Sequence, residues 1–191
     1  SVNAIYYNKV SVLVGDYLLA TSLTNAAMTG DVQLVELVGR LGQELSEGEI
    51  IQLNNINASD FSEDVYFEVI KKKTAALFAA AAEAGAISVK CTDEMAKKAC
   101  LFGELIGIAF QIKDDIFDYY TSDVLGKPTG NDMREGKLTL PALYVLNTWK
   151  EPSMIELALK IRALEATDEE IARFIAYIKE NGCIDYATKV M

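Results

Sequence analysis

Three aspartates, Asp114, Asp115 and Asp118, lie close together near the middle of this sequence. On a helix, positions three and four apart share a face, so all three carboxylates would crowd one end of one face. Two like charges about 6 Å apart repel by about 3 kcal/mol at an effective dielectric of about 20, so a cation would offset the crowding. Mg²⁺ usually takes one or two carboxylates together with substrate phosphates. The triplet therefore indicates either a Mg²⁺–diphosphate site or a solvated acidic helix end.

The residues before the triplet extend the same face. Gln111, Gly107 and Gly103 follow it backwards, which places an amide and then two residues without side chains below the carboxylates. Glycine costs about 1 kcal/mol relative to alanine inside a helix, so two of them need a reason. One reason is close packing against another helix, and the other is a groove that admits a long molecule beneath the metal site. The sequence leaves both open.

Lysines provide the second group of candidates. The run Lys71-Lys72-Lys73-Thr74 lies in mid-helix, where the stripe from Ile70 through Lys73 and Thr74 to Leu77 shares one face. We expect Lys73 and Thr74 to point inward. Lys71 and Lys72 are more simply explained as a solvated basic face.

A long polar segment, TSDVLGKPTGNDMREG at residues 121–136, follows the aspartates. Loops of this length are usually functional or mobile. The charged residues in and just after this loop include Lys127, Asp132, Arg134 and Lys137. Cations are scarce in this chain, so the three cations can close over an anion held on the metal. Ordinary solvation of the loop is the alternative.

Composition excludes several classes of function. The net charge of −10 argues against nucleic acid and against anionic membranes as partners. The absence of histidine rules out Ser-His-Asp and Cys-His catalysis and His-ligated zinc. Three cysteines without a CxxC spacing fit a reducing, cytoplasmic location, and no apolar run reaches transmembrane length.

The elements that must position these residues are all expected to be helices. The central helix lies between residues 91 and 120, which contain no proline. Residues 10–28, apolar on most sides, predict a buried helix with Gly15 and Asp16 inside it. Further helices are expected over 31–43, over 46–55 and from Ser59 or Asp60 into the run of alanines at 79–82. Thr167 with Glu170 forms a capping box, and Gly182 is expected to end that helix.

Together these residues resemble the trans-prenyltransferases, the family of polyprenyl, farnesyl and geranylgeranyl diphosphate synthases. The segment from Gly107 through Phe110-Gln111 to Asp118 is similar to the family's second aspartate-rich motif. Further similarity covers the whole chain in order, in Gly15-Asp16-Tyr17-Leu18-Leu19, Gly48-Glu49, Lys73-Thr74-Ala75, Gly126-Lys127-Pro128 and Gly136-Lys137-x-Thr139-x-Pro141.

The resemblance implies an all-α barrel of antiparallel helices around a central cavity, the isoprenoid synthase type. It also implies Mg²⁺-dependent ionisation of an allylic prenyl diphosphate and its head-to-tail condensation with isopentenyl diphosphate, in a homodimer. By position, Asp114 would ligate Mg²⁺, with Asp115 and Asp118 in or near the metal shell. Also by position, Lys73, Lys127 and Lys137 would contact the allylic diphosphate. Thr74 and Gln111 would stabilise the allylic cation, and Phe110 would lie near isopentenyl diphosphate.

This chain lacks the family's first aspartate-rich motif and the arginine pair after it. The sequence DDIFD is not that motif, because no arginine pair follows it and Phe110-Gln111 precedes it. We therefore expect residues 1–191 to form a single helical prenyl-synthase domain, incomplete at both ends, with little synthase activity by itself. A non-catalytic regulatory subunit of a heteromeric synthase is one alternative. A class I terpene cyclase is another, but the Asn/Asp-Ser/Thr-Glu metal triad of such enzymes is not found.

Overall fold

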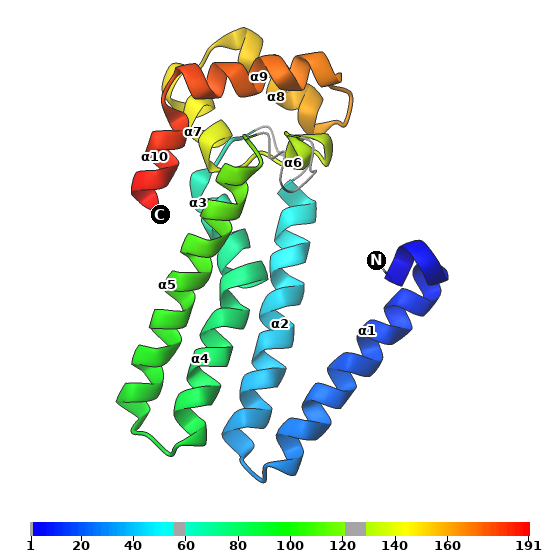
Figure 1. Cartoon of the computed structure of the whole chain (residues 1–191), viewed down its shortest axis with the longest axis vertical. Coiled ribbons are helices and arrows are strands. Elements are labelled where there is room, and N and C mark those ends of the chain that lie inside the picture. The colour runs from blue at the N-terminus through cyan, green and yellow to red at the C-terminus, as the bar shows by residue number, and fades with distance from the viewer. Residues whose placement is uncertain (1, 56–59, 121–128) are drawn as a thin grey trace.

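The computed structural model describes residues 2–55, 60–120 and 129–191. Within these residues every regular element is helical, which confirms the predicted class (Figure 1). In chain order the elements are α1 (Val2–Met28), α2 (Val32–Asn55), α3 (Glu63–Ile70), the π-helical η1 (Lys71–Ala75), α4 (Ala76–Ser88), α5 (Asp93–Phe117), α6 (Asn131–Arg134), α7 (Leu140–Trp149), α8 (Pro152–Arg162), α9 (Asp168–Glu180) and α10 (Cys183–Val190).

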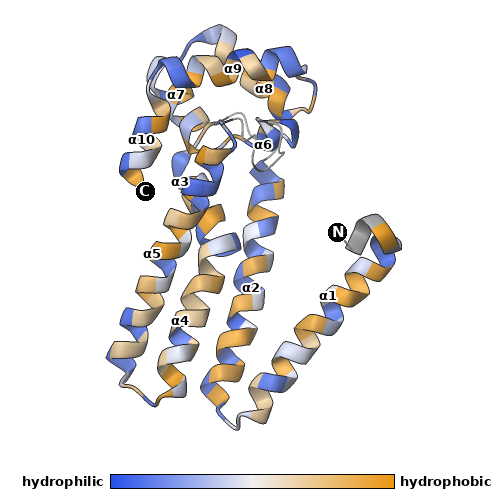
Figure 2. Cartoon of the chain, in the orientation of Figure 1, coloured by the Kyte–Doolittle hydropathy of each residue, from blue (hydrophilic) through white to orange (hydrophobic). Residues whose placement is uncertain are grey.

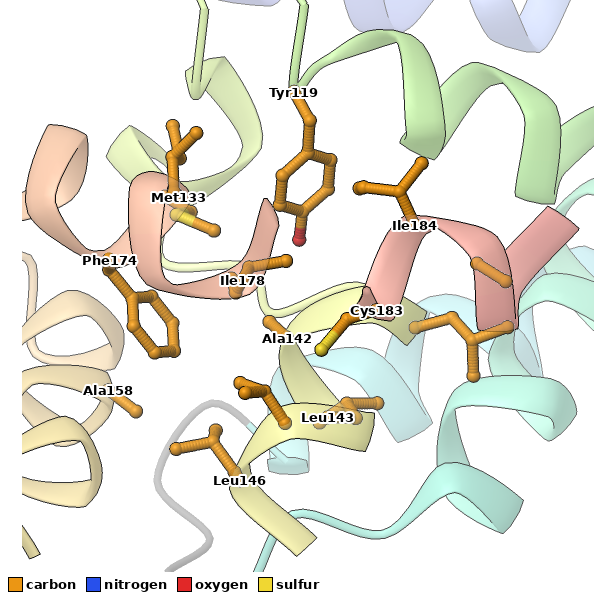
Figure 3. Close-up of a cluster of buried hydrophobic side chains, with 14 of the residues drawn as sticks. Tyr119, Met133, Ala142, Leu143, Leu146, Ala158, Phe174, Ile178, Cys183 and Ile184 are labelled. Atoms are coloured by element: carbon orange, nitrogen blue, oxygen red, sulfur yellow. The ribbon is translucent and has the colours of Figure 1, made fainter. Parts of the chain in front are cut away.

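The long helices run antiparallel to their sequence neighbours, and the short helices α7–α10 gather at one end of them (Figure 1). The core lies at that end, where fully buried side chains from α5, α7 and α9 such as Ile112, Leu140 and Phe174 pack together. Figure 3 shows Phe174, Ile178 and Cys183 directed toward α7 in this cluster. Burial of an aliphatic or aromatic side chain is worth about 1.5–3 kcal/mol, so this end anchors the last turns of α5.

Local capping residues define the start of α5 and the ends of α9, and those of α9 are the predicted ones. Thr92 accepts a hydrogen bond from the backbone N–H of Met95 and so begins the central helix. Thr167 and Glu170 form the expected capping box at α9. Gly182 follows that helix with a φ of 69°, the left-handed conformation that glycine adopts at low cost.

The two glycines of the central helix pack against the preceding helix. A Cβ at Gly103 would lie 2.8 Å from the Cα of Ala79, and one at Gly107 would lie 2.5 Å from the Cα of Ala75. Both would strike backbone, which cannot rotate away. Of the two reasons that the sequence leaves open for these glycines, the structure shows the first: they permit close contact of α5 with η1 and α4, and no groove for a substrate chain lies there.

Two other expectations about helix bounds are wrong. Residues 32–55 form one helix, because Ser46 donates its hydroxyl to the carbonyl of Gly42 at 2.9 Å and stays inside the helix. The next helix begins after Ser62, whose side chain accepts from the N–H of Val65. Ser59 lies outside the described residues, and Asp60 precedes the cap.

Helix α1 is exposed, contrary to the expectation that residues 10–28 are buried. Leu13 is 65% exposed and Tyr17 is 71% exposed, and Asp16 also faces solvent. The reason is that α1 lies beside α2 and diverges from it along its length, so its apolar residues have no second neighbour (Figures 1 and 2). Among the described residues, no helix combines the length and the apolarity that a membrane crossing needs.

Candidate functional site

A cavity of about 330 Å³ lies where α2, α3, η1 and α5 meet the segment 132–143. It brings together residues that are far apart in sequence, including most of the predicted site. The predicted residues in its lining are Lys73, Thr74, Gln111, Asp114, Asp115 and Lys137. Unpredicted polar residues in its lining include Gln52, Asn55, Ser62, Tyr66, Asp132, Thr139 and Arg162.

The lysine run lies in the π-helical turn η1, which no proline or glycine in the sequence signals. Such turns are rare and are frequent at functional sites. Lys71 pairs with Glu104 at 2.9 Å and Lys72 with Glu47 at 2.7 Å, away from the cavity, whereas Lys73 lines it. Lys73 therefore lines the cavity as expected, whereas Lys71 and Lys72 do not line it and pair with glutamates.

Helix α2 approaches η1 closely at Gly48. A Cβ at Gly48 would lie 2.9 Å from the Cβ of Lys72 and 3.0 Å from the backbone nitrogen of Lys73. This approach lets α2 reach the Lys73 ammonium, which donates to Gln52 Oε1 at 2.7 Å and pairs with Glu49 at 2.5 Å. Glu49 and Gln52 therefore hold this ammonium at the wall of the cavity.

Lys137 supplies a second ammonium to the same cavity. It pairs with Glu135 at 2.5 Å and lies 3.9 Å from the carboxylate of Asp132. Partial burial by itself would lower the pKa of Lys137, but its hydrogen bond with Glu135 and the nearby carboxylates raise that pKa overall. Among the described residues, the partners of the two ammoniums are carboxylates and one amide, which an anion can replace.

The three aspartates that the sequence groups together have three different environments. Asp114 is exposed and lines the cavity, and its carboxylate accepts no hydrogen bond from any described residue. Asp115 is 4% exposed and accepts from Tyr66 and Gln111. Asp118 accepts from the backbone N–H groups of Asn131 and Asp132, each at 3.0 Å, and so fixes the start of α6.

Burial dominates the electrostatics of Asp115. Desolvation raises the pKa of its carboxyl to about 7, although the hydrogen bonds from Tyr66 and Gln111 act in the opposite direction. Burial also raises the pKa of Tyr66, and the Asp115 charge raises it further, so the phenol stays protonated and remains a donor.

A fourth carboxylate, Asp132, also lines the cavity. Burial and the neighbouring Asp118 raise its pKa to about 6, and Asp114 contributes in the same direction. In the sequence, Asp132 lies in the polar segment 121–136 and carries no sign of a metal role. Its distance along the sequence from the three aspartates gives no helical register that would place it beside them. The chain returns through α6, and this return brings Asp132 to the cavity.

Thr74 and Gln111 both line the cavity and are hydrogen-bonded to each other. The Thr74 hydroxyl donates to Gln111 Oε1 at 2.7 Å, which links η1 to α5. Phe110 instead lies outside the cavity lining, 54% exposed, with its ring centroid 5.3 Å from that of Phe78. Lys127 lies outside the described residues.

The donor set can be compared with what Mg²⁺ requires. In the described ranges no group of three or more acidic, cysteine or histidine side chains is gathered as a closed metal cage. Mg²⁺ seldom uses such cages and prefers one or two carboxylates with waters and phosphates. The exposed Asp114 and the neighbouring Asp132, on the same cavity as Lys73 and Lys137, fit a metal of this kind shared with a phosphate ligand.

Comparison with known proteins gives a consistent result. Residues 1–178 match the model of the family described as polyprenyl synthetase. Octaprenyl diphosphate synthase of Escherichia coli is 38% identical over 161 residues, which are 83% of this chain and 50% of that protein. The chain thus spans about half the length of the curated relatives it matches.

Solved structures agree with the sequence matches. Geranylgeranyl pyrophosphate synthase from Bacteroides thetaiotaomicron is 57% identical, with a TM-score of 0.91 over 99% of this chain and 63% of that chain. A polyprenyl synthase from Caulobacter crescentus, complexed with calcium and isoprenyl diphosphate, is 35% identical. It has a TM-score of 0.90 over 98% of this chain and 58% of that one.

Proposed function

Because this chain belongs to the polyprenyl synthetase family, we propose that it acts in head-to-tail prenyl transfer. The reaction condenses an allylic prenyl diphosphate with isopentenyl diphosphate to give a longer polyprenyl diphosphate. The observation that carries the proposal is the placement of the Lys73 and Lys137 ammoniums and the free Asp114 carboxylate on one cavity. Together these groups suit a diphosphate held through a divalent cation.

The diphosphate would enter between the two lysines. Its oxygens would replace Glu49 and Gln52 on Lys73 and Glu135 on Lys137, since charge-assisted contacts to phosphate are strong. The displaced carboxylates lie at the rim and can turn to solvent. Exchange of partners in this way keeps both ammoniums paired before and after binding.

Asp114, with Asp132 beside it, would hold Mg²⁺ against the diphosphate. When bound, Mg²⁺ neutralises the charge that develops on the departing diphosphate as the allylic C–O bond breaks. Asp118 contributes indirectly, because it fixes the segment that carries Asp132 and leads to Lys137. We therefore assign Asp114 as the ligand from the triplet and the other two to supporting positions.

The allylic carbon becomes positive as the diphosphate leaves. Thr74 and Gln111 lie on the same cavity and offer oxygen dipoles that stabilise this charge. The alkene of isopentenyl diphosphate then attacks the cation, and one proton is lost from the new chain. No histidine and no protein nucleophile is needed, in agreement with the composition.

We also propose that the protein works as a homodimer. The exposed apolar side chains of α1, such as Leu13, Tyr17 and Leu18, form a stripe that a second copy can cover. Contiguous apolar surfaces of this kind mark interaction sites in soluble proteins.

A cytoplasmic location is proposed from the cysteines, all three of which are unpaired thiols.

The proposal is tested on the protein at its full natural length. With Mg²⁺, an allylic diphosphate and radiolabelled isopentenyl diphosphate, we expect labelled prenyl diphosphates longer than the allylic substrate. EDTA and Asp114→Ala should each abolish them, whereas Glu156→Gln, an exposed carboxylate on α8, should leave the rate unchanged. Release of a cyclised hydrocarbon without consumption of isopentenyl diphosphate would instead indicate a terpene cyclase.

A further inference from the structure

Four side chains that line the cavity are joined in a continuous series of hydrogen bonds, and one of them, Tyr66, also packs against the core. The Tyr66 hydroxyl donates to Asp115 Oδ2 at 2.6 Å, and Gln111 Nε2 donates to Asp115 Oδ1 at 2.8 Å. Gln111 Oε1 in turn accepts from the Thr74 hydroxyl at 2.7 Å. This hydrogen-bonded series of side chains therefore links α3, α5 and η1, three elements that pack together around the cavity.

The donors and acceptors in this series of hydrogen bonds can be arranged in one direction of donation only. An ionised carboxylate only accepts, so with Asp115 ionised Gln111 must turn its NH₂ group toward Asp115 and its carbonyl oxygen toward Thr74. A threonine hydroxyl has one proton, and here it is used on Gln111. The remaining lone pairs of the Thr74 oxygen then have no proton between them and the cavity that Thr74 lines.

Resting on the proposed function, we propose that Tyr66 and Asp115 are positioning residues that fix the direction of this hydrogen-bonded chain. They thereby make Thr74 present a bare oxygen to the place where positive charge develops on the substrate. The role differs from metal ligation, because both Asp115 oxygens are already occupied by donors from the protein and the side chain is 4% exposed. Tyr66, 9% exposed, holds the carboxylate from the side away from Gln111.

An asparagine in place of Asp115 tests the direction without changing the volume of the side chain. Its amide can offer either a donor or an acceptor to Gln111, so Gln111 can turn over and donate from Nε2 to Thr74. The threonine proton would then point into the cavity and repel a cation there. Tyr66→Phe removes one donor to Asp115 and leaves the aspartate side chain itself unchanged.

Two isosteric probes measure the polarity that the cavity presents. They are trimethylammonioethyl diphosphate and tert-butylethyl diphosphate. The first carries a positively charged nitrogen where the second carries a neutral carbon, and the two are otherwise alike. Calorimetry in Mg²⁺ should show that the wild type prefers the ammonium probe. We expect Asp115→Asn to reduce this preference about 10-fold and Tyr66→Phe about 3-fold, the range that one to two altered hydrogen bonds cover. Thr74→Ser should retain the preference, since it keeps the hydroxyl.

A double-mutant cycle separates the orientation of Thr74 from the charge of Asp115. If Asp115 acts through the threonine, Asp115→Asn should have no further effect on the preference in a Thr74→Val background. An undiminished effect in that background would overturn the proposal. If Asp115→Asn does not fold, Tyr66→Phe in both backgrounds gives the same test.

Inorganic diphosphate with Mg²⁺ serves as the reference ligand. Its affinity should stay within about 2-fold of wild type in Asp115→Asn, because neither the metal ligand nor the lysines have changed. Loss of this binding in a folded variant would make Asp115 a metal ligand and overturn the positioning role. Absence of Mg²⁺-dependent binding in the wild type would instead contradict the proposed function itself.

Discussion

Lys73 differs from Lys71 and Lys72 in the direction in which its side chain points. Its ammonium lines the cavity, whereas Lys71 pairs with Glu104 outside it. We expect Lys73→Ala to weaken Mg²⁺-dependent binding of inorganic diphosphate about 10- to 100-fold, since a hydrogen bond to a charged group is worth about 1.5–3 kcal/mol. Titration calorimetry measures the change. Lys71→Ala is the matched control and should bind as the wild type does; equal losses in both would mean that the cavity does not receive the anion.

The buried carboxyl of Asp115 should make stability depend on pH. Its pKa is about 7 in the folded protein, against 3.8 when unperturbed, so the folded state holds more protons between these values. The contribution of this group to stability therefore falls as pH rises from about 4 to about 7 and is constant above that range. We expect the wild type to lose on the order of 1–3 kcal/mol relative to Asp115→Asn over this window.

Urea denaturation of both proteins in EDTA, across the same pH range, tests this expectation. The free-energy difference between them should change with pH, while the difference between wild type and Glu156→Gln should vary much less because Glu156 is exposed. A difference from Asp115→Asn that stays constant across the range would show that the carboxyl is not held in its protonated form by burial.

At the scale of elements, the site depends on how closely α5 packs against η1 and α4. Gly107→Ala would force a Cβ within 2.5 Å of the Cα of Ala75, and overpacking of this kind costs about 1–3 kcal/mol or more. Gly85 lies inside α4 with nothing within 4 Å of its Cβ position, so Gly85→Ala should stabilise the helix by up to about 1 kcal/mol. Thermal unfolding of the two variants gives the sign of each change. A neutral Gly107→Ala would mean that the helices stand further apart and that a groove exists there.

The sequence was a better guide to individual helices than to their contacts. The capping box at Thr167 and the existence of a long helix between residues 91 and 120 follow from local residue types, and both are confirmed. The meaning of Gly103 and Gly107 could not be decided, because it depends on a neighbour from another part of the chain. The π-helical turn has no local signal, and the place of Asp132 results from the return of the chain through α6.

At the scale of the whole molecule, α1 is the element with the most unsatisfied apolar surface. Its sequence predicted a buried helix, and the pattern is consistent with burial against a second copy rather than within one chain. We expect the protein to sediment as a dimer, and Leu13→Glu with Leu18→Glu to shift it to a monomer, since burying unpaired charges in an interface is costly. Leu159→Glu, an exposed position on α8, is the control. Analytical ultracentrifugation distinguishes the two states, and a wild-type monomer at high concentration would contradict the proposed homodimer.

The assignment of prenyl transfer depends on one arrangement, a divalent cation on Asp114 and a diphosphate between Lys73 and Lys137. Crystals grown with Mn²⁺ and inorganic diphosphate, examined by anomalous scattering, test it most directly. The account predicts a metal peak about 2.1 Å from an Asp114 carboxylate oxygen and diphosphate oxygens within hydrogen-bonding distance of both ammoniums. A metal bound elsewhere, or a diphosphate that leaves Lys73 on Glu49 and Lys137 on Glu135, would contradict it.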